Sequence, residues 1–235
     1  MDLISSGLKL HGVVLGLGFA LLVVACDSPD ADGEDSTEDA IKGGGIVAQS
    51  NHPEVGALHV GPQVYAATLI GRRTVVTAAH VIGSANCSNR EGCAGPLMFW
   101  TDGNRDIPIR RFRSFGKPFV YPLKDVAVLE LAAQPTGIPA AGIGSPPAAG
   151  RPVSFWGYGA PHRGEKQKVV FKWGPARIGE VGDSGGAYLN ESGEIFAVLS
   201  DERHTTDSHN GEDTYSLLAA VEDDVNATMG SWGAR

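Results

Sequence analysis

Gly182-Asp183-Ser184-Gly185-Gly186 is the strongest motif in this sequence of 235 residues. A serine hydroxyl is a weak nucleophile, so it needs a base within hydrogen-bond reach and N–H groups aimed at a developing oxyanion. Gly182 places no side chain in the way of a substrate, and its N–H together with that of Ser184 could form an oxyanion hole. The pentapeptide therefore predicts a nucleophilic serine whose base comes from elsewhere in the chain.

Two further motifs place a histidine and an aspartate at the ends of apolar runs. They are Thr77-Ala78-Ala79-His80 and Asp125-Val126-Ala127-Val128-Leu129. Strand ends of this kind present polar side chains at a cleft. With the order His80, Asp125, Ser184, the sequence resembles the chymotrypsin-like (trypsin-fold) serine peptidases over most of its length, from about Ile41 to about Met229.

The resemblance implies an all-β fold of two antiparallel six-stranded β-barrels with a short C-terminal helix. The composition agrees, because 14 prolines and 32 glycines spread along the chain favour many short strands and turns. We expect a peptidase domain over 41–235, with the first barrel at about 41–135 and the second at about 150–235. The expected helix carries three apolar residues on one face, Val221, Val225 and Met229.

The same resemblance implies a role for each residue of the site. His80 would be the general base that takes the proton of Ser184, and Asp125 would fix the tautomer of His80. The N–H groups of Gly182 and Ser184 would hold the oxyanion during hydrolysis of a peptide bond in a protein substrate. Such a mechanism needs no metal and no organic cofactor. The alternative is a surface binding or scaffold protein that keeps the peptidase fold without turnover.

Four residues are candidates for the substrate pocket. The position six before the nucleophile, which sets the base of the pocket in the family, is Ile178. It offers an apolar floor and gives no support to a preference for Arg or Lys. Ser200, Asp201 and Glu202 stand where the family has Ser-Trp-Gly, the edge that pairs with the substrate backbone. The two acids either admit basic residues, spoil the wall of the pocket or simply face solvent. Asp213 is a further acidic candidate that could receive a cation.

The N-terminus has the features of a bacterial export signal. Residues 1–25 contain Lys9 and an apolar run that is too short to span a bilayer as a stable helix. The run ends in Leu22-Val23-Val24-Ala25-Cys26, which resembles a lipobox, so we expect a lipid on Cys26 and attachment to a membrane of the cell envelope. The alternatives are an ordinary cleavage after Ala25 and secretion after a later cut.

An acidic segment separates this signal from the expected domain. Residues 26–40 are rich in Asp and Glu and contain no basic or aromatic residue, so they cannot bury enough surface to fold. We interpret them as a flexible tether. They carry most of the net charge of −8, which leaves the folded part close to neutral. This balance argues against nucleic acid as a partner, and we expect a monomer.

Three cysteines leave one unpaired in an oxidising compartment. Cys87 and Cys93 are close in sequence and make the plausible disulfide, while Cys26 is the candidate for lipidation. The other interpretation of Cys87 and Cys93 is two free thiols.

Activation is predicted from Ile41-Lys42-Gly43-Gly44, which matches the I-x-G-G start of mature family members. In the family, a buried aspartate beside the oxyanion loop pairs with the newly cut amine, and Asp183 holds that position here. A buried carboxylate without a partner is costly. Ile46-Val47 is a rival start. The alternative is an uncut chain that is competent because an internal donor satisfies Asp183.

Overall fold

The computed structural model describes residues 44–83, 97–116, 124–160, 162–176, 178–201 and 214–234. All of them belong to one unit, Ser36–Arg235. Several predicted features lie outside these ranges: the signal peptide 1–25, the tether 26–40, Cys26, Ile41, the pair Cys87 and Cys93, and Asp213.

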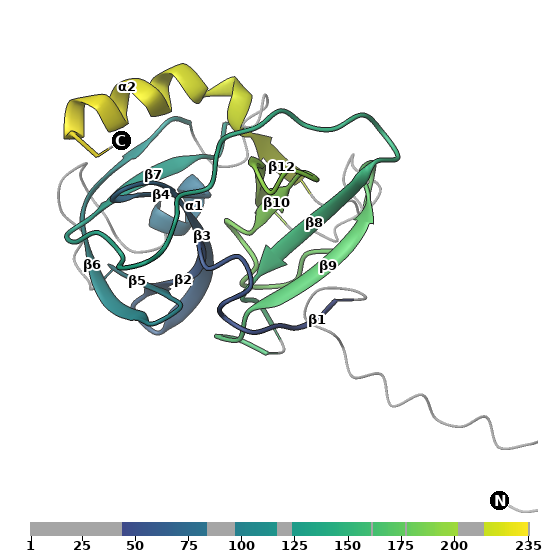
Figure 1. The fold of residues 1–235 in the computed structure, drawn as a ribbon, viewed down its shortest axis with the longest axis horizontal. Coiled ribbons are helices and arrows are strands. Elements are labelled where there is room, and N and C mark those ends of the chain that lie inside the picture. Colours follow the sequence, from purple (N-terminus) through teal and green to yellow (C-terminus); the bar gives the residue numbers. More distant parts are fainter. Residues whose placement is uncertain are drawn as a thin grey trace, which may run out of the picture. The chain divides into compact units, whose positions relative to one another are not determined.

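The first half of the described chain closes into a six-stranded antiparallel barrel (Figure 1). The strand order around it is β2-β3-β4-β7-β6-β5. The strands are β2 (Val55–Val60), β3 (Gln63–Gly71), β4 (Thr74–Thr77), β5 (Leu97–Thr101), β6 (Asn104–Ser114) and β7 (Ala127–Leu131). The short helix α1 (Ala79–Gly83) follows β4.

The barrel closes around a core of aliphatic residues. Both β4 and β7 are buried along their whole length. They pair through Thr77 opposite Ala127, so the end of β4 and the start of β7 lie side by side. This register determines which side chains meet at the rim of the barrel.

The second half forms a six-stranded antiparallel sheet with the order β1-β9-β8-β10-β11-β12. Its strands are β1 (Gly45–Ile46), β8 (Pro152–Gly157), β9 (Gln167–Lys172), β10 (Ala187–Leu189), β11 (Ile195–Asp201) and β12 (Thr214–Leu217). Within the described residues, β1 and β12 are the two ends of this sheet. The segment between β9 and Ser184 is short and contributes no further strand there, so the described part of the sheet stays open.

The predicted fold class is confirmed. The structure is mostly β, with a closed six-stranded barrel, a second sheet and a C-terminal helix, as in the chymotrypsin-like two-barrel fold. That helix is α2 (Glu222–Trp232), preceded by the 3₁₀ turn η1 (Leu218–Ala220). No helix in the described ranges is long and apolar enough to cross a membrane.

Helix α2 runs along the first barrel (Figure 1), although it follows the last strand of the second sheet. The predicted apolar face is the buried one, since Val225 is fully buried and Val221 and Met229 nearly so. Arg113 of β6 donates to Thr228 Oγ1 at 3.1 Å. The helix therefore ties the end of the chain back to the first half.

One apolar cluster joins the two halves. It contains Ala66 and Val126 from the barrel and Trp156 and Ala187 from the second sheet. Because residues from both halves are buried in one cluster, the strand ends that carry the candidate catalytic groups are held at a fixed distance.

Candidate active site

His80 and Asp125 meet at the rim of the first barrel. Asp125 lies just before β7, and His80 lies in α1, which follows β4. The register of β4 and β7 therefore brings the two residues together. His80 Nδ1 is 2.6 Å from Asp125 Oδ2, and the backbone N–H of His80 donates to Asp125 Oδ1 at 2.8 Å.

The carboxylate of Asp125 is fully buried. Ser200 Oγ donates to Asp125 Oδ2 at 2.6 Å, and the backbone N–H of Asp125 donates to Ser216 Oγ at 3.0 Å. Burial raises the pKa of Asp125, but the hydrogen bonds from His80 and Ser200 outweigh burial and lower this pKa overall. Asp125 is therefore ionised at neutral pH and holds the proton of His80 on Nδ1, which leaves Nε2 as the basic nitrogen.

Ser184 lies on a segment that is in direct contact with the strands leading to His80. Its carbonyl accepts a hydrogen bond from Ala66 N of β3 at 3.2 Å, and Ser184 is 5% exposed. A side chain on Gly185 would lie 2.1 Å from Thr77 Oγ1, so this glycine lets the serine segment pack against the end of β4. Ser184, the candidate nucleophile, and His80, the candidate base, thus come from adjoining segments.

The loop before the serine is a four-residue turn from Glu180 to Asp183. Asp183 N donates to Glu180 O at 2.9 Å. Gly182, at the third position, has a φ of 100°, a value that favours glycine as in a type II turn. Within the described part of the chain, the N–H groups of Gly182 and Ser184 donate to no protein acceptor. They are therefore available to an oxyanion.

The fully buried carboxylate of Asp183 anchors this turn. Its Oδ1 accepts a hydrogen bond from Gly159 N at 2.7 Å, and its Oδ2 accepts one from Glu180 N at 3.0 Å. A Cβ on Gly157 would lie 2.0 Å from Asp183 Oδ1, so glycine is required where β8 ends. Each oxygen of the Asp183 carboxylate thus accepts a hydrogen bond from a backbone N–H group.

Residues 41–174, more than half of the chain, match the protein family described as Trypsin. The chain belongs to the trypsin family. The matched region includes His80 and Asp125, whereas Ser184 lies beyond it. No curated protein matches the sequence.

Two solved structures share the fold of this chain over more than three quarters of its length. The VesB protease of Vibrio cholerae is 17% identical with a TM-score of 0.56, over 77% of this chain and 65% of that one. This chain therefore spans about two thirds of the length of VesB. Human heparin binding protein is 16% identical with a TM-score of 0.63, over 79% of this chain and 95% of that one. At these identities the likeness concerns the fold alone.

The residues predicted for the substrate pocket of this trypsin-family chain lie in different places. Ile178 is 6% exposed and packs in an apolar cluster with Tyr188 and Leu199. Ser200 Oγ donates to Asp125 Oδ2, so Ser200 belongs to the hydrogen-bond network of Asp125 and His80. Asp201 is the last residue of β11, and Asp213 lies outside the described residues. Within those residues, no group of His, Cys, Asp or Glu could hold a metal ion.

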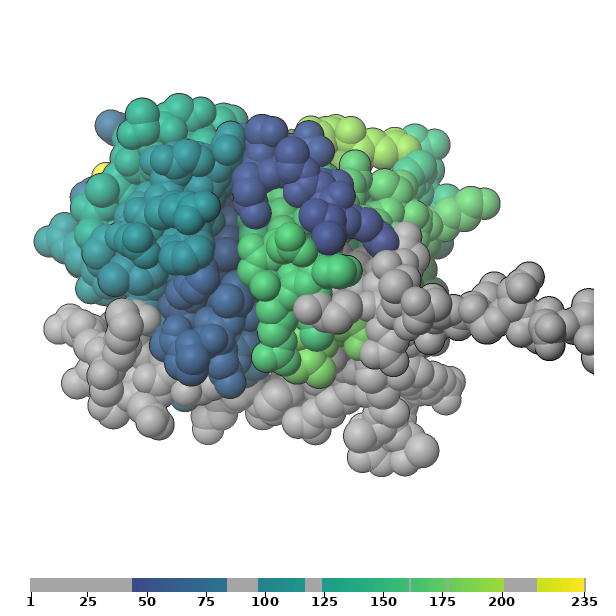
Figure 2. All heavy atoms as spheres, turned by 90° about the horizontal axis from the view of Figure 1, so that it is seen from below, coloured from purple at the N-terminus to yellow at the C-terminus, as the bar shows by residue number. Residues whose placement is uncertain are grey.

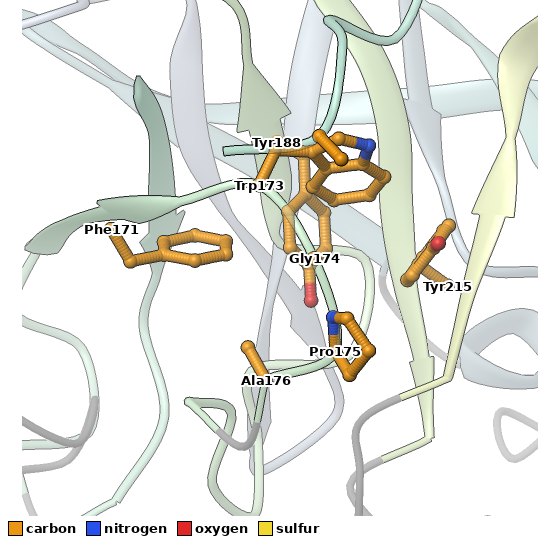
Figure 3. A pocket seen from close by; sticks show the side chains of 8 residues that line it. Phe171, Trp173, Gly174, Pro175, Ala176, Tyr188 and Tyr215 are labelled. Carbon is orange, nitrogen blue, oxygen red and sulfur yellow. The ribbon is translucent and has the colours of Figure 1, made fainter. Parts of the chain in front are cut away.

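Sequence reasoning missed Ser216 and an aromatic pocket beside it. The pocket has a volume of about 160 Å³ and lies between the ends of β9, β10 and β12 (Figure 3). Its walls include Phe171, Trp173, Pro175, Ala176, Tyr188 and Tyr215. Side chains alternate along a strand, so Tyr215 and Ser216 face opposite sides of β12. This alternation is the signal that could have found both features, because it assigns Tyr215 and Ser216 to different faces of the strand. The strand is short, and its limits are not sharply marked in the sequence.

The contact between Gly157 and Asp183 yields a prediction about stability. The change Gly157→Ala would force a methyl group into the space of a buried carboxylate oxygen, and overpacking of this kind costs about 1–3 kcal/mol. For a domain of this size, that lowers Tm by roughly 2–12 °C. The control Gly45→Ala meets no atom within 4 Å and should leave Tm almost unchanged. Equal Tm values for the two variants in a thermal melt would contradict the packing described here.

Proposed function

We propose that this chain is a serine endopeptidase that hydrolyses peptide bonds through an acyl-enzyme. One observation carries the proposal: a buried, ionised Asp125 holds His80, which lies in α1 just after β4, and the end of β4 adjoins the segment of Ser184. Membership of the trypsin family supports serine peptidase chemistry in general.

The roles of the three side chains follow from this arrangement. His80 Nε2 takes the proton of Ser184 as Oγ attacks the carbonyl carbon of the scissile bond, and the carbonyl oxygen becomes an oxyanion. Asp125 stabilises the imidazolium of His80. That imidazolium then protonates the leaving amine, which gives the acyl-enzyme. Water activated by the same imidazole hydrolyses the acyl-enzyme and restores Ser184.

The N–H groups of Gly182 and Ser184 supply the electrostatic part of the mechanism. Donors that are fixed before the reaction need no reorganisation as charge develops on the oxygen, and each is worth about 10²–10³ in kcat. The turn that carries Gly182 is held by the buried carboxylate of Asp183.

The first prediction of this proposal concerns the nucleophile. A fluorophosphonate probe should label Ser184 covalently, and Ser184→Ala or His80→Ala should abolish labelling and lower kcat by at least about 10⁴. Asp125→Asn should leave a small residual rate. The exposed serine of the 190–193 turn, Ser192, supplies the control, because Ser192→Ala should label as the wild type does. A folded wild type that stays unlabelled would favour the binding or scaffold alternative.

The second prediction concerns the substrate residue before the scissile bond. Ile178 lies in an apolar cluster, and a buried cation without a partner is costly, so we propose a preference for uncharged residues at this position. A peptide library varied at this one position measures it by the distribution of cleaved products. Dominant cleavage after Arg or Lys would contradict the preference and point to Asp213 or Asp201.

Membrane attachment through Cys26 is a further part of the proposal. Acyl chains contribute about 0.8 kcal/mol per buried CH₂, so an N-terminus with several chains stays anchored where a single chain does not. The basis is the lipobox-like sequence that ends at Cys26, followed by the acidic segment 26–40.

Cleavage before Ile41 would release the domain from this anchor and give Asp183 an ammonium partner. The backbone donors Gly159 and Glu180 instead support the alternative, in which the chain that begins at Cys26 is already competent.

The third prediction concerns the N-terminus of the mature protein. Mass spectrometry of the membrane fraction should find a lipid-modified peptide that starts at Cys26, and Cys26→Ser should release the protein into the soluble fraction. N-terminal sequencing of the probe-labelled species then identifies the competent form. A start at Ile41 supports cleavage, a start at Cys26 refutes it, and an unmodified wild type that is fully soluble would refute the anchor.

A further inference from the structure

Lys166 is fully buried at the start of β9, and the proposed reaction does not use it. Its Nζ donates to the carbonyl oxygens of Gln49, Asn51 and His52 at 2.9, 3.0 and 2.9 Å. An ammonium has three donors and no acceptor, so these three carbonyls satisfy it completely. The side chain therefore holds the turn at 49–52 in one conformation.

This turn lies against the second half of the molecule. Figure 2 shows the purple beginning of the described chain in contact with the green part around residues 150–175. Val47 N donates to Lys166 O at 2.9 Å, and the hydroxyl of Tyr158 donates to Gln49 Oε1 at 2.7 Å. Tyr158 is fully buried, and its hydroxyl can also donate to Val55 O at 3.2 Å, so the shorter of its two contacts is the one to the turn.

The residues next to Tyr158 support the oxyanion turn. Gly159 N donates to Asp183 Oδ1, and Ala160 N donates to Val181 O at 2.9 Å. Gln167, the neighbour of Lys166, donates from Nε2 to Gly159 O at 3.1 Å. Hydrogen bonds, linked by short covalent steps within Gln49, Tyr158–Gly159 and Lys166–Gln167, thus lead from Lys166 to the loop that carries Gly182.

We propose that Lys166 is a positioning residue for the oxyanion loop, and that its ammonium keeps the turn 49–52 and the segment 157–160 in the arrangement that aims the N–H groups of Gly182 and Ser184. The inference rests on the proposed peptidase function and adds that the protonation of Lys166 makes the activity depend on pH. Lys166 acts through the loop and does not contact the substrate.

The protonation of Lys166 makes this arrangement sensitive to alkali. Burial lowers the pKa of Lys166 to about 8, while Glu54 and Asp102 act in the opposite direction. Two other titratable groups contact the turn: His52, whose Nδ1 is 2.6 Å from Glu54 Oε1, and Tyr158, whose pKa is raised by burial so that its hydroxyl stays protonated across this range. A neutral amine has two donors and a lone pair, so after deprotonation one of the three carbonyls faces the lone pair. The turn then loses one of its three fixed bonds.

Global stability should change in the opposite direction to activity. The pKa of Lys166 in the folded protein is below the ordinary value of 10.5, so the unfolded chain binds more protons between about pH 8 and 10.5. The free energy of unfolding contributed by this group therefore rises with pH across that window. Loss of activity near pH 8 without a fall in Tm is the signature of a local change at Lys166.

The test compares the pH dependence of kcat in the wild type, Lys166→Met and the exposed control Lys172→Met. In the wild type and the control, kcat should fall with an apparent pKa near 8. Compared with the wild type at pH 7, Lys166→Met should have a kcat at least about tenfold lower and a KM within about twofold, because a small displacement of the oxyanion donors weakens mainly transition-state binding. The kcat of Lys166→Met should also show no alkaline fall up to pH 9.5. An unchanged alkaline fall in Lys166→Met would assign it to another group, such as a free α-amine, and overturn the proposal.

A second readout does not depend on activity. Hydrogen exchange at the amide of Gly159, corrected for its intrinsic rate, reports how firmly Asp183 is held. Protection in the wild type should fall at least about tenfold from pH 7 to pH 9, and Lys166→Met should show the lower protection already at pH 7. Where Lys166→Met does not fold, Tyr158→Phe replaces it, with reduced protection at pH 7. Protection that is the same at both pH values would overturn the inference, even for a protein without peptidase activity.

Discussion

The buried carboxylate of Asp125 is the constraint on which the rest of the site depends. A charge removed from water is tolerated only when donors surround it, and here they come from both halves of the molecule. His80 belongs to the first barrel, and Ser200 belongs to the second sheet. The two halves therefore pack in the arrangement that satisfies this carboxylate. The shared apolar cluster keeps them there, so folding and assembly of the catalytic groups are one event.

Much of this arrangement could be predicted from the sequence, because short motifs fix local geometry. The apolar runs that end at His80 and begin at Asp125 are adjacent strands, and pairing of their ends leaves little freedom for the two side chains. Helix α2 was equally accessible, since Val221, Val225 and Met229 have helical spacing and all lie on the buried face. In each case the sequence motif and the local structure that it predicts span only a few residues.

What could not be predicted depends on contacts between distant segments. Lys166 looks like any surface lysine in the sequence, and only the return of the turn 49–52 to its side shows that it is buried. Ser216 has no motif of its own. The pairing of β1 with β9 at one end of the second sheet was also hidden, because it joins residues 45–46 to residues 167–168, far away in the sequence. The aromatic pocket was hidden too, because its walls come from segments that are far apart in the sequence, around residues 171–176, 188 and 215.

Asp183 and Lys166 are both fully buried, and backbone groups of the described residues contact both charges. N–H groups surround the carboxylate, and carbonyls surround the ammonium. An ion pair between side chains could follow a moving loop, because both partners have rotatable stems. A cage of backbone dipoles cannot, since its donors and acceptors are fixed by the chain itself. Each buried charge therefore favours one conformation of the turn that it contacts, and between them lies the segment 157–160. Such charges contribute little net stability, so their effect is best understood as geometric: in the proposed mechanism they aim the N–H groups of Gly182 and Ser184 before any substrate arrives.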